Sequence, residues 1–185
     1  MLPKRFLLKP FPGEGNPAGV TIGGSIGRRA EILSVHCEVR GDLSMVSIPT
    51  AAEASRRRDR LWEETCFELF LGAADSDAYW ELNLSPSGDW NVYRFTRYRE
   101  GMCGERAFTS LPFTVRIGPK ILELSMELDV GKIIPARKTV EAGIAAVIGT
   151  IDGGKSHWAL GHPASLPDFH RRDGFALILP CYPGI

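Results

Sequence analysis

The sequence predicts an all-β protein, an antiparallel and jelly-roll-like β-sandwich. Short segments in which apolar and polar residues alternate recur almost to the end of the chain, and turn-forming residues separate them, including 20 Gly and 13 Pro among 185 residues. A long string of antiparallel strands must close on itself or stack two sheets to protect its edges. The apolar content of 44% supplies one substantial core, so we predict a single domain over residues 1–185.

The expected strands follow one another with a single helical interruption. In chain order they cover residues 5–9, 18–22, 32–40, 44–48, 65–71, 79–85, 90–98, 113–117, 121–129, 141–149, 157–160 and 174–179. Residues 50–60 are the one stretch that looks helical, because Thr50 and Glu53 form the capping-box pattern of a helix start. The sequence contains no internal repeat, low-complexity segment or interdomain linker.

Two central strands allow side chains to be assigned to faces. In residues 65–71 the apolar side carries Phe67, Leu69 and Leu71, and the reverse carries Cys66, Glu68 and Phe70. In residues 79–85 the apolar side carries Trp80, Leu82 and Leu84, and the reverse carries Tyr79, Glu81, Asn83 and Ser85. We therefore expect Trp80 in the core and a polar face on the other side of the sheet.

The turns predict how these strands align. Ser87-Gly88 suits a two-residue hairpin turn, which would place Glu81 opposite Arg94. Matching the apolar faces of the first two strands then places Glu68 opposite Glu81. The result is a row of Glu68, Glu81 and Arg94 across three strands, on a face that also carries Tyr79, Asn83 and Thr96.

This face has the groups that a sugar site requires. Flat aromatic surfaces pack against sugar rings, and fixed donors and acceptors bind the hydroxyl groups. Trp62 and Trp90 flank the strands as candidate platforms beside Glu68, Tyr79, Glu81, Asn83 and Arg94. The structural alternative is a satisfied Glu-Arg-Glu network covered by loops, with both tryptophans packed at the ends of the sandwich.

The segments LWEETCFELFLG and YWELNLSPSGDWNVYRF resemble the DOMON-like group related to family 9 carbohydrate-binding modules. The resemblance covers residues 61–95, and ALGHPASLPDFHRRDGF is similar to the same group. It implies a β-sandwich that binds a sugar or, in other DOMON relatives, haem, without catalysis of its own. Glu68 matches the acidic residue of the family strand, and Thr65 stands where the carbohydrate-binding pattern usually has Asp.

Two other functions stay open. Directly opposed glutamates have Cβ atoms about 4.5–5.5 Å apart, close to the carboxylate separation of retaining glycosidases, about 5–5.5 Å, so Glu68 and Glu81 form a candidate hydrolase pair. Arg94 argues against this function, because a cation lowers the pKa that the catalytic acid needs raised. The sequence also lacks a GxSxG elbow, a P-loop and a dinucleotide fingerprint. The third possibility is a protein-interaction sandwich.

Four metal-competent side chains lie close together in the sequence: His157, His162, Asp168 and His170. Their spacing matches no standard zinc motif, and the nearby prolines favour a loop held by hydrogen bonds, so we predict no metal and no cofactor. Haem would need an axial pair such as Met102 with one of these histidines.

The composition bears on partners and location. The chain has 22 basic residues, Lys plus Arg, and 22 acidic residues, Asp plus Glu. It therefore has no net charge that would attract nucleic acid or an anionic membrane surface as a partner. No apolar run approaches the roughly 20 residues of a transmembrane helix or forms a signal peptide, and we expect a cytoplasmic protein. Cys37, Cys66, Cys103 and Cys181 lack CxxC spacing and are expected to be unpaired. The basic run at residues 56–60 is expected to be a solvated loop or helix face.

Overall fold

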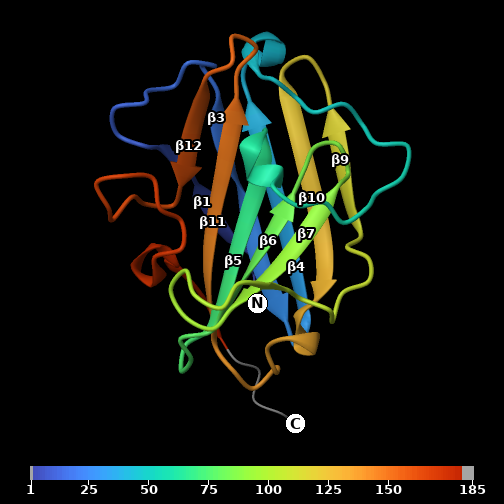
Figure 1. Ribbon diagram of the computed structural model, residues 1–185, viewed down its shortest axis with the longest axis vertical. Helices are drawn as coiled ribbons and strands as arrows, with labels where there is room; N and C mark the ends of the chain where they lie inside the picture. The colour runs from blue at the N-terminus through green and yellow to red at the C-terminus, as the bar shows by residue number, and fades with distance from the viewer. Residues whose placement is uncertain (1, 181–185) are drawn as a thin grey trace.

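The computed structural model describes residues 2–180 and shows two antiparallel sheets packed face to face, which confirms the predicted β-sandwich (Figure 1). One sheet has the order β1-β3-β4-β10-β9, and the other has the order β2-β12-β11-β5-β6-β7-β8, with β13 beside β11. The strands are β1 Lys4–Leu7, β2 Lys9–Pro10, β3 Thr21–Arg29, β4 Ile32–Arg40, β5 Cys66–Ala73, β6 Tyr79–Leu84, β7 Trp90–Phe95, β8 Cys103–Gly104, β9 Phe113–Ile117, β10 Ile121–Asp129, β11 Val140–Gly149, β12 Lys155–Ala159 and β13 Leu177–Leu179.

The main core lies between the sheets and follows the period-two pattern of the sequence. Leu33, Val35 and Cys37 of β4 face Phe67 and Leu69 of β5 across this core. Burial of the alternate apolar residues supplies most of the driving force for folding, at about 25 cal/mol per Å² of apolar surface.

The second sheet is unusual because its central strands are buried on both faces. All eight residues of β5 are buried, including Glu68 and the glycine and alanine at its end. Aromatic side chains on the outer face form a second, smaller core of Phe70, Tyr79, Tyr93, Phe95 and Phe175. The polar residues among them are therefore removed from water, and each needs a partner.

Several strands differ from the sequence prediction at their bounds. Residues 32–40, 113–117 and 121–129 are strands as predicted, whereas β3 extends to Arg29 through the glycine-rich TIGGSIGRR. Because glycines lower β-propensity, the sequence pattern did not indicate this part of the strand. Gly24 is required there, because a Cβ at this position would lie 1.9 Å from the backbone oxygen of His36. Residues 44–48 are not a strand: Leu43–Met45 is a 3-10 helix, and Val46 makes an isolated bridge to Thr150.

The predicted helix at residues 50–60 is wrong. The backbone of this segment bonds to the β6–β7 hairpin instead of to itself: Ala52 N–H donates to Ser87 O at 2.8 Å, and Arg58 N–H donates to Trp90 O at 2.9 Å. A short helix gains little by itself, because its first turn orders several residues for one hydrogen bond. Pairing with the end of the hairpin satisfies the same backbone groups.

The predicted register of the central strands is also wrong. Glu68 pairs with Asn83 and not with Glu81, a shift of two residues that keeps both faces unchanged. On the other side of β6, Glu81 pairs with Tyr93, and Arg94 pairs with Trp80. The connection before β7 is one residue longer than a two-residue turn, with Gly88 at φ +96°, and a slip of one residue turns every β7 side chain to the opposite face.

Two other features bear on earlier predictions. The described cysteines Cys37, Cys66 and Cys103 are free, as predicted, and Cys181 lies outside the described residues. Within residues 2–180, no helix has the length and apolar character needed to cross a membrane.

Arg28 of β3 is expected to be a stability determinant. Its buried guanidinium donates to four backbone oxygens, those of Ala30, Ile134, Pro135 and Lys138, at 2.7–3.3 Å. Arg28→Met would leave these acceptors without donors and should lower the free energy of unfolding by about 2–4 kcal/mol in urea denaturation. The matched control Arg29→Met changes an exposed neighbour and should shift it by less than about 0.5 kcal/mol. Equal effects of the two variants would contradict this role.

Candidate functional site

A pocket of about 360 Å³ lies on the outer face of the second sheet. Its floor is Glu68 of β5, Glu81 of β6 and Val147 of β11, which share one face of the sheet. The remaining lining residues come from the covering loops, β7 and β12: Trp62, Phe95, Arg99, Met102, His157, Pro167, Phe169 and His170. This volume lies near the lower end of the range for ligand sites, about 300–1,000 Å³.

Two segments far apart in the sequence wall the pocket. The loop after β7 crosses in front of the second sheet in Figure 1, and residues 160–176, drawn in red, lie beside β11 and β12. Arg99 of the first segment donates to Asp168 of the second at 2.9 Å, and the hydroxyl of Tyr98 donates to the same carboxylate. Gly143 of β11 leaves room for Phe175, because a Cβ there would lie 2.9 Å from the phenylalanine ring.

Two of the three non-glycine residues with a left-handed backbone in the described chain lie in or next to the pocket wall. Arg99 has a left-handed backbone with φ +54°, and Arg60, which precedes the 3-10 helix Leu61–Glu63 that carries Trp62, has φ +62°. A residue with a side chain adopts this conformation at a cost, and such strain is enriched at ligand sites. Here it places Arg99 and Trp62 on the pocket wall.

Glu81 belongs to a hydrogen-bonded network behind the pocket. Asn83 Nδ2 donates to Glu81 Oε1 at 2.7 Å. The fully buried Tyr79 hydroxyl accepts from the backbone N–H of Arg99 at 3.2 Å and lies 2.8 Å from His170 Nδ1. Because the hydroxyl oxygen already accepts from Arg99, we assign its proton to His170 Nδ1 and the ring proton of His170 to Nε2, which faces Glu81 Oε2 at 3.8 Å.

Glu68 is the exception in this network. Its side chain is 5% exposed, lines the pocket and forms no hydrogen bond or ion pair within the described residues. Most buried polar groups are satisfied, because an unsatisfied one costs about 1–3 kcal/mol. A buried carboxyl that faces a pocket without a protein partner is a group available to a ligand.

The surroundings of the pocket raise the pKa of both of its carboxyl groups, Glu68 and Glu81. Burial raises the pKa of Glu81 to about 7, while the bond from Asn83 and the charge of Arg99 oppose the shift. Burial and the nearby Glu81 raise the pKa of Glu68 well above its usual range. Burial and Arg99 lower the pKa of His170 to about 4, so this imidazole is neutral at pH 7.

The structure brings together only part of the predicted site. Trp62, Glu68 and Glu81 line the pocket, while Tyr79 and Asn83 lie behind it and hold His170 and Glu81 in place. Trp62 also makes an edge contact with Tyr93, with ring centroids 5.8 Å apart.

Trp90 and Arg94 are not in the pocket, because the slip in the hairpin turns both to the inner face. Trp90 is buried in the core between the sheets, and the Arg57 guanidinium covers its ring at 4.4 Å. Arg94 is exposed beside Trp80, 5.9 Å from the ring centroid. Their predicted placement as a rim platform and a partner of Glu81 is therefore wrong. Arg57 is also not simply solvated, since it binds Asn91 Oδ1 at 2.7 Å.

The four metal-competent side chains have separate hydrogen-bond partners. His157 Nδ1 lies 2.9 Å from Glu14 Oε1, His162 Nε2 lies 2.9 Å from the backbone oxygen of Lys9, and Asp168 binds Arg99. His157 lies in β12, and the other three side chains belong to the segment that follows this strand. Met102 lines the pocket with His157 and His170, but both ring nitrogens of His170 already face Tyr79 and Glu81.

Sequence reasoning missed the loop residues of the pocket. Phe95 shares the outer face with Tyr93, so the correct turn length would have placed it. Arg99 and Phe169 reach the pocket through contacts between distant segments, and no local pattern indicates them. The prolines around the histidines were the only signal for an ordered loop there.

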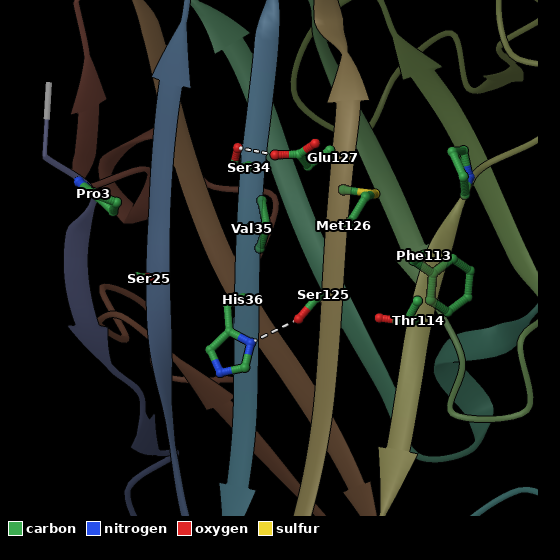
Figure 2. Close-up of a pocket in the computed structure, with 11 residues that line it drawn as sticks. Pro3, Ser25, Ser34, Val35, His36, Phe113, Thr114, Ser125, Met126 and Glu127 are labelled. Atoms are coloured by element: carbon green, nitrogen blue, oxygen red, sulfur yellow. Dashed lines mark hydrogen bonds between the residues drawn. The ribbon is translucent and has the colours of Figure 1, made fainter.

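A second hollow lies on the outer face of the first sheet. It has a volume of about 710 Å³, and polar side chains on its floor are hydrogen-bonded to one another (Figure 2). His36 Nδ1 lies 2.9 Å from Ser125 Oγ, and Ser34 Oγ donates to Glu127 at 3.3 Å. This hollow is larger but more open, and its charged groups are paired or exposed, so the first pocket is the stronger site.

Replacement of Glu81 is expected to change how stability depends on pH. The pKa of Glu81 in the folded state, about 7, lies above its ordinary value of 4.5. Between these pH values the folded protein keeps a proton that the unfolded chain has lost, so rising pH disfavours folding. Glu81→Gln removes this effect, and its free energy of unfolding minus that of the wild type should increase from about pH 5 to about pH 8 in urea denaturation.

His170 acts in the opposite direction, because its pKa is lowered in the folded state: its contribution is present above pH 6.5 and is lost as the pH falls towards 4. The histidine is present in both proteins, so the difference reports Glu81 together with Glu68, whose pKa the Glu81 carboxyl raises and which therefore acts in the same direction. A difference that stays constant or shrinks with pH would contradict the assignment.

Comparison with known proteins gives a match in structure but not in sequence. No protein-family model matches the chain, and no curated protein is similar to it in sequence. A proposed carbohydrate-binding protein from Bacteroides uniformis has a similar structure, with a TM-score of 0.68 and 15% identity over 93% of this chain and 84% of the other. The chain therefore shares the fold of that protein.

Two solved structures of a family 9 carbohydrate-binding module from Caldicellulosiruptor kristjanssonii also match, at lower similarity. The complex with glucose has a TM-score of 0.44 and 10% identity over 76% of this chain and 66% of the other, and the complex with cellotriose has a TM-score of 0.48 and 10% identity over 88% and 75%.

Proposed function

We propose that the pocket on the outer face of the second sheet binds a small carbohydrate and does not transform it. The observation that carries the proposal is Glu68, a buried carboxyl without a protein partner on the floor of a pocket whose wall includes Trp62. A protonated or ionised carboxyl binds hydroxyl groups, and an indole ring packs against the apolar face of a sugar ring.

The other lining groups support the same ligand. The guanidinium of Arg99 uses Nε and Nη2 on Asp168, and its Nη1 has no hydrogen-bond acceptor among the described residues. Phe95 and Phe169 add aromatic surface on the remaining sides. The floor lies on paired strands, so its polar groups are preorganised and lose little conformational freedom on binding.

The size and the structural neighbour agree with a sugar of one or two rings. A pocket of about 360 Å³ suits a ligand of that size. The similar protein from Bacteroides uniformis is described as carbohydrate-binding, which supports the same class of ligand for this chain.

Trp62→Ala should weaken binding of a saccharide by about 1–3 kcal/mol, the scale of a lost aromatic platform. Isothermal titration with a panel of monosaccharides and disaccharides measures this loss. Trp62→Phe should retain part of the affinity, and Arg94→Gln on the opposite face should bind like the wild type. If no saccharide binds the wild type, the proposal fails, and capture of a specific protein partner would instead support the interaction function.

Glycoside hydrolysis is the second candidate, favoured by two buried carboxyls with raised pKa values in one pocket. In the observed register Glu68 and Glu81 are diagonal neighbours, which typically lie about 7–8 Å apart, with their Cβ atoms somewhat closer. That spacing fits inverting enzymes, with carboxyls about 6.5–9.5 Å apart, and not retaining ones. Glu68 would give its proton to the leaving oxygen as the glycosidic bond breaks, and Glu81 would take a proton from the attacking water.

The binding proposal predicts that the protein releases no aglycone from aryl glycosides. Nitrophenyl glycosides of the sugars that bind in titration provide the assay, with absorbance as the readout. Turnover that disappears in both Glu68→Gln and Glu81→Gln, and persists in the exposed control Glu63→Gln, would establish the hydrolase and overturn the non-catalytic proposal.

A further inference from the structure

We infer that the carbohydrate bound in this pocket carries a cationic amino group, and that this group binds against Glu68. The inference rests on the proposed function and names the class of sugar, an amino sugar with a free ammonium group. It follows from the charges around Glu68, from the aromatic lining and from the metal-ligating groups that the pocket lacks.

The titratable groups that face Glu68 are Glu81 from β6, Cys66 from its own strand, Arg99 from the loop after β7, His170 and His157. Arg99 is the one permanent cation among them, and it is already paired with Asp168 at 2.9 Å.

Asp168 is the ionised partner of that pair. Although burial opposes the shift, bonds from Tyr98 and Arg99 hold its pKa below the ordinary value. His157 interacts with Glu14, and His170 is neutral at pH 7. Within the described residues, therefore, Arg99 is the one positive charge that acts on Glu68; it lowers the pKa of this group, but burial and Glu81 outweigh it.

A buried carboxyl in this position has two ways to avoid an uncompensated charge. It can keep a proton, which its raised pKa favours, or it can ionise against a cation supplied by the ligand. An ammonium group provides three donors, and the carboxyls of Glu68 and Glu81 are acceptors on one floor. Charge-assisted hydrogen bonds of this kind are about twice as strong as neutral ones.

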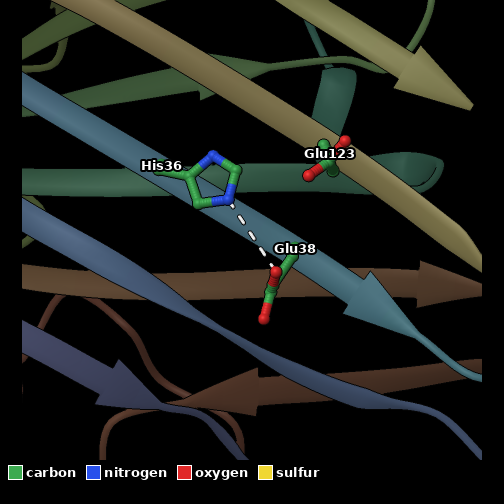
Figure 3. Close-up of side chains that lie close together, drawn as sticks. All are labelled: His36, Glu38 and Glu123. Atoms are coloured by element: carbon green, nitrogen blue, oxygen red, sulfur yellow. Dashed lines mark ion pairs between the residues drawn. The ribbon is translucent and has the colours of Figure 1, made fainter.

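The rest of the lining favours an organic cation. Trp62, Phe95 and Phe169 surround the carboxyls, and aromatic faces attract a desolvated ammonium group. A metal ion would need several oxygen or nitrogen ligands at short range. In the described part of the chain, the one such group of three is His36, Glu38 and Glu123 on the other sheet (Figure 3). Arg40 already pairs with Glu38 there at 2.7 Å.

The test compares sugars that differ only in charge. Glucosamine, galactosamine, mannosamine and 6-amino-6-deoxyglucose are titrated at pH 7 beside glucose, galactose, mannose and glucuronate. At least one amino sugar should bind about 10-fold or more tightly than its neutral parent, the scale of a charged hydrogen bond. Binding should release protons, which titration in two buffers of different ionisation enthalpy detects.

Glu68→Gln keeps the shape of the side chain and removes its charge. The variant should lose the preference for the amino sugar and the proton release, while it retains binding of the neutral parent. Glu63→Gln, an exposed carboxylate beside Trp62, is the matched control and should keep the preference. If Glu68→Gln does not fold, proton release by the wild type decides.

Each other outcome is informative. Neutral sugars that bind as tightly as amino sugars, or a preference that survives Glu68→Gln, would overturn this inference and leave the carbohydrate proposal intact. Tighter binding of glucuronate than of glucose would also overturn it, because two carboxyls on the floor should repel an anion. Failure of every sugar would remove the proposed function itself.

Discussion

The site depends on one constraint, which is that β5 and its neighbours are buried on both faces. The inner face packs against the first sheet, and loops cover the outer face, so polar side chains there must find partners within the protein. Asn83 binds Glu81, Tyr79 binds His170, and Asn91 binds Asp59 at 2.7 Å. Glu68 is left without one. An unsatisfied group in such surroundings costs stability, and a ligand is the natural way to recover it.

The loops that bury this face also give the pocket its shape. Residues 96–102 and 160–176 are distant in sequence, and the pair of Arg99 with Asp168 joins them over the sheet. The left-handed backbone of Arg99 and the missing Cβ of Gly143 each cost some conformational stability, and both allow these loops to pack over the sheet. A pocket assembled in this way is formed before the ligand arrives, which reduces the entropy lost on binding.

The proposed amino-sugar ligand and the candidate hydrolase use the same two carboxyls differently. Binding of a cation requires Glu68 to ionise against the ligand, whereas hydrolysis requires it to keep a proton and then transfer it. The environment raises the pKa of both groups, and both functions begin from this state. Proton release on binding and release of an aglycone therefore separate them in solution.

The sequence by itself determined which side chains share a face. Period-two alternation in residues 65–71 and 79–85 placed Glu68 and Glu81 on one surface and Leu69 and Leu82 in the core, because successive side chains of a strand point to opposite sides. Only the tertiary structure decided the register. One extra residue in the connection at Gly88 moved Arg94 and Trp90 to the other face, since alternation fixes faces within a strand but not the alignment between strands. Arg99 and His170 reached the pocket through contacts between loops distant in sequence, for which a local pattern holds no information.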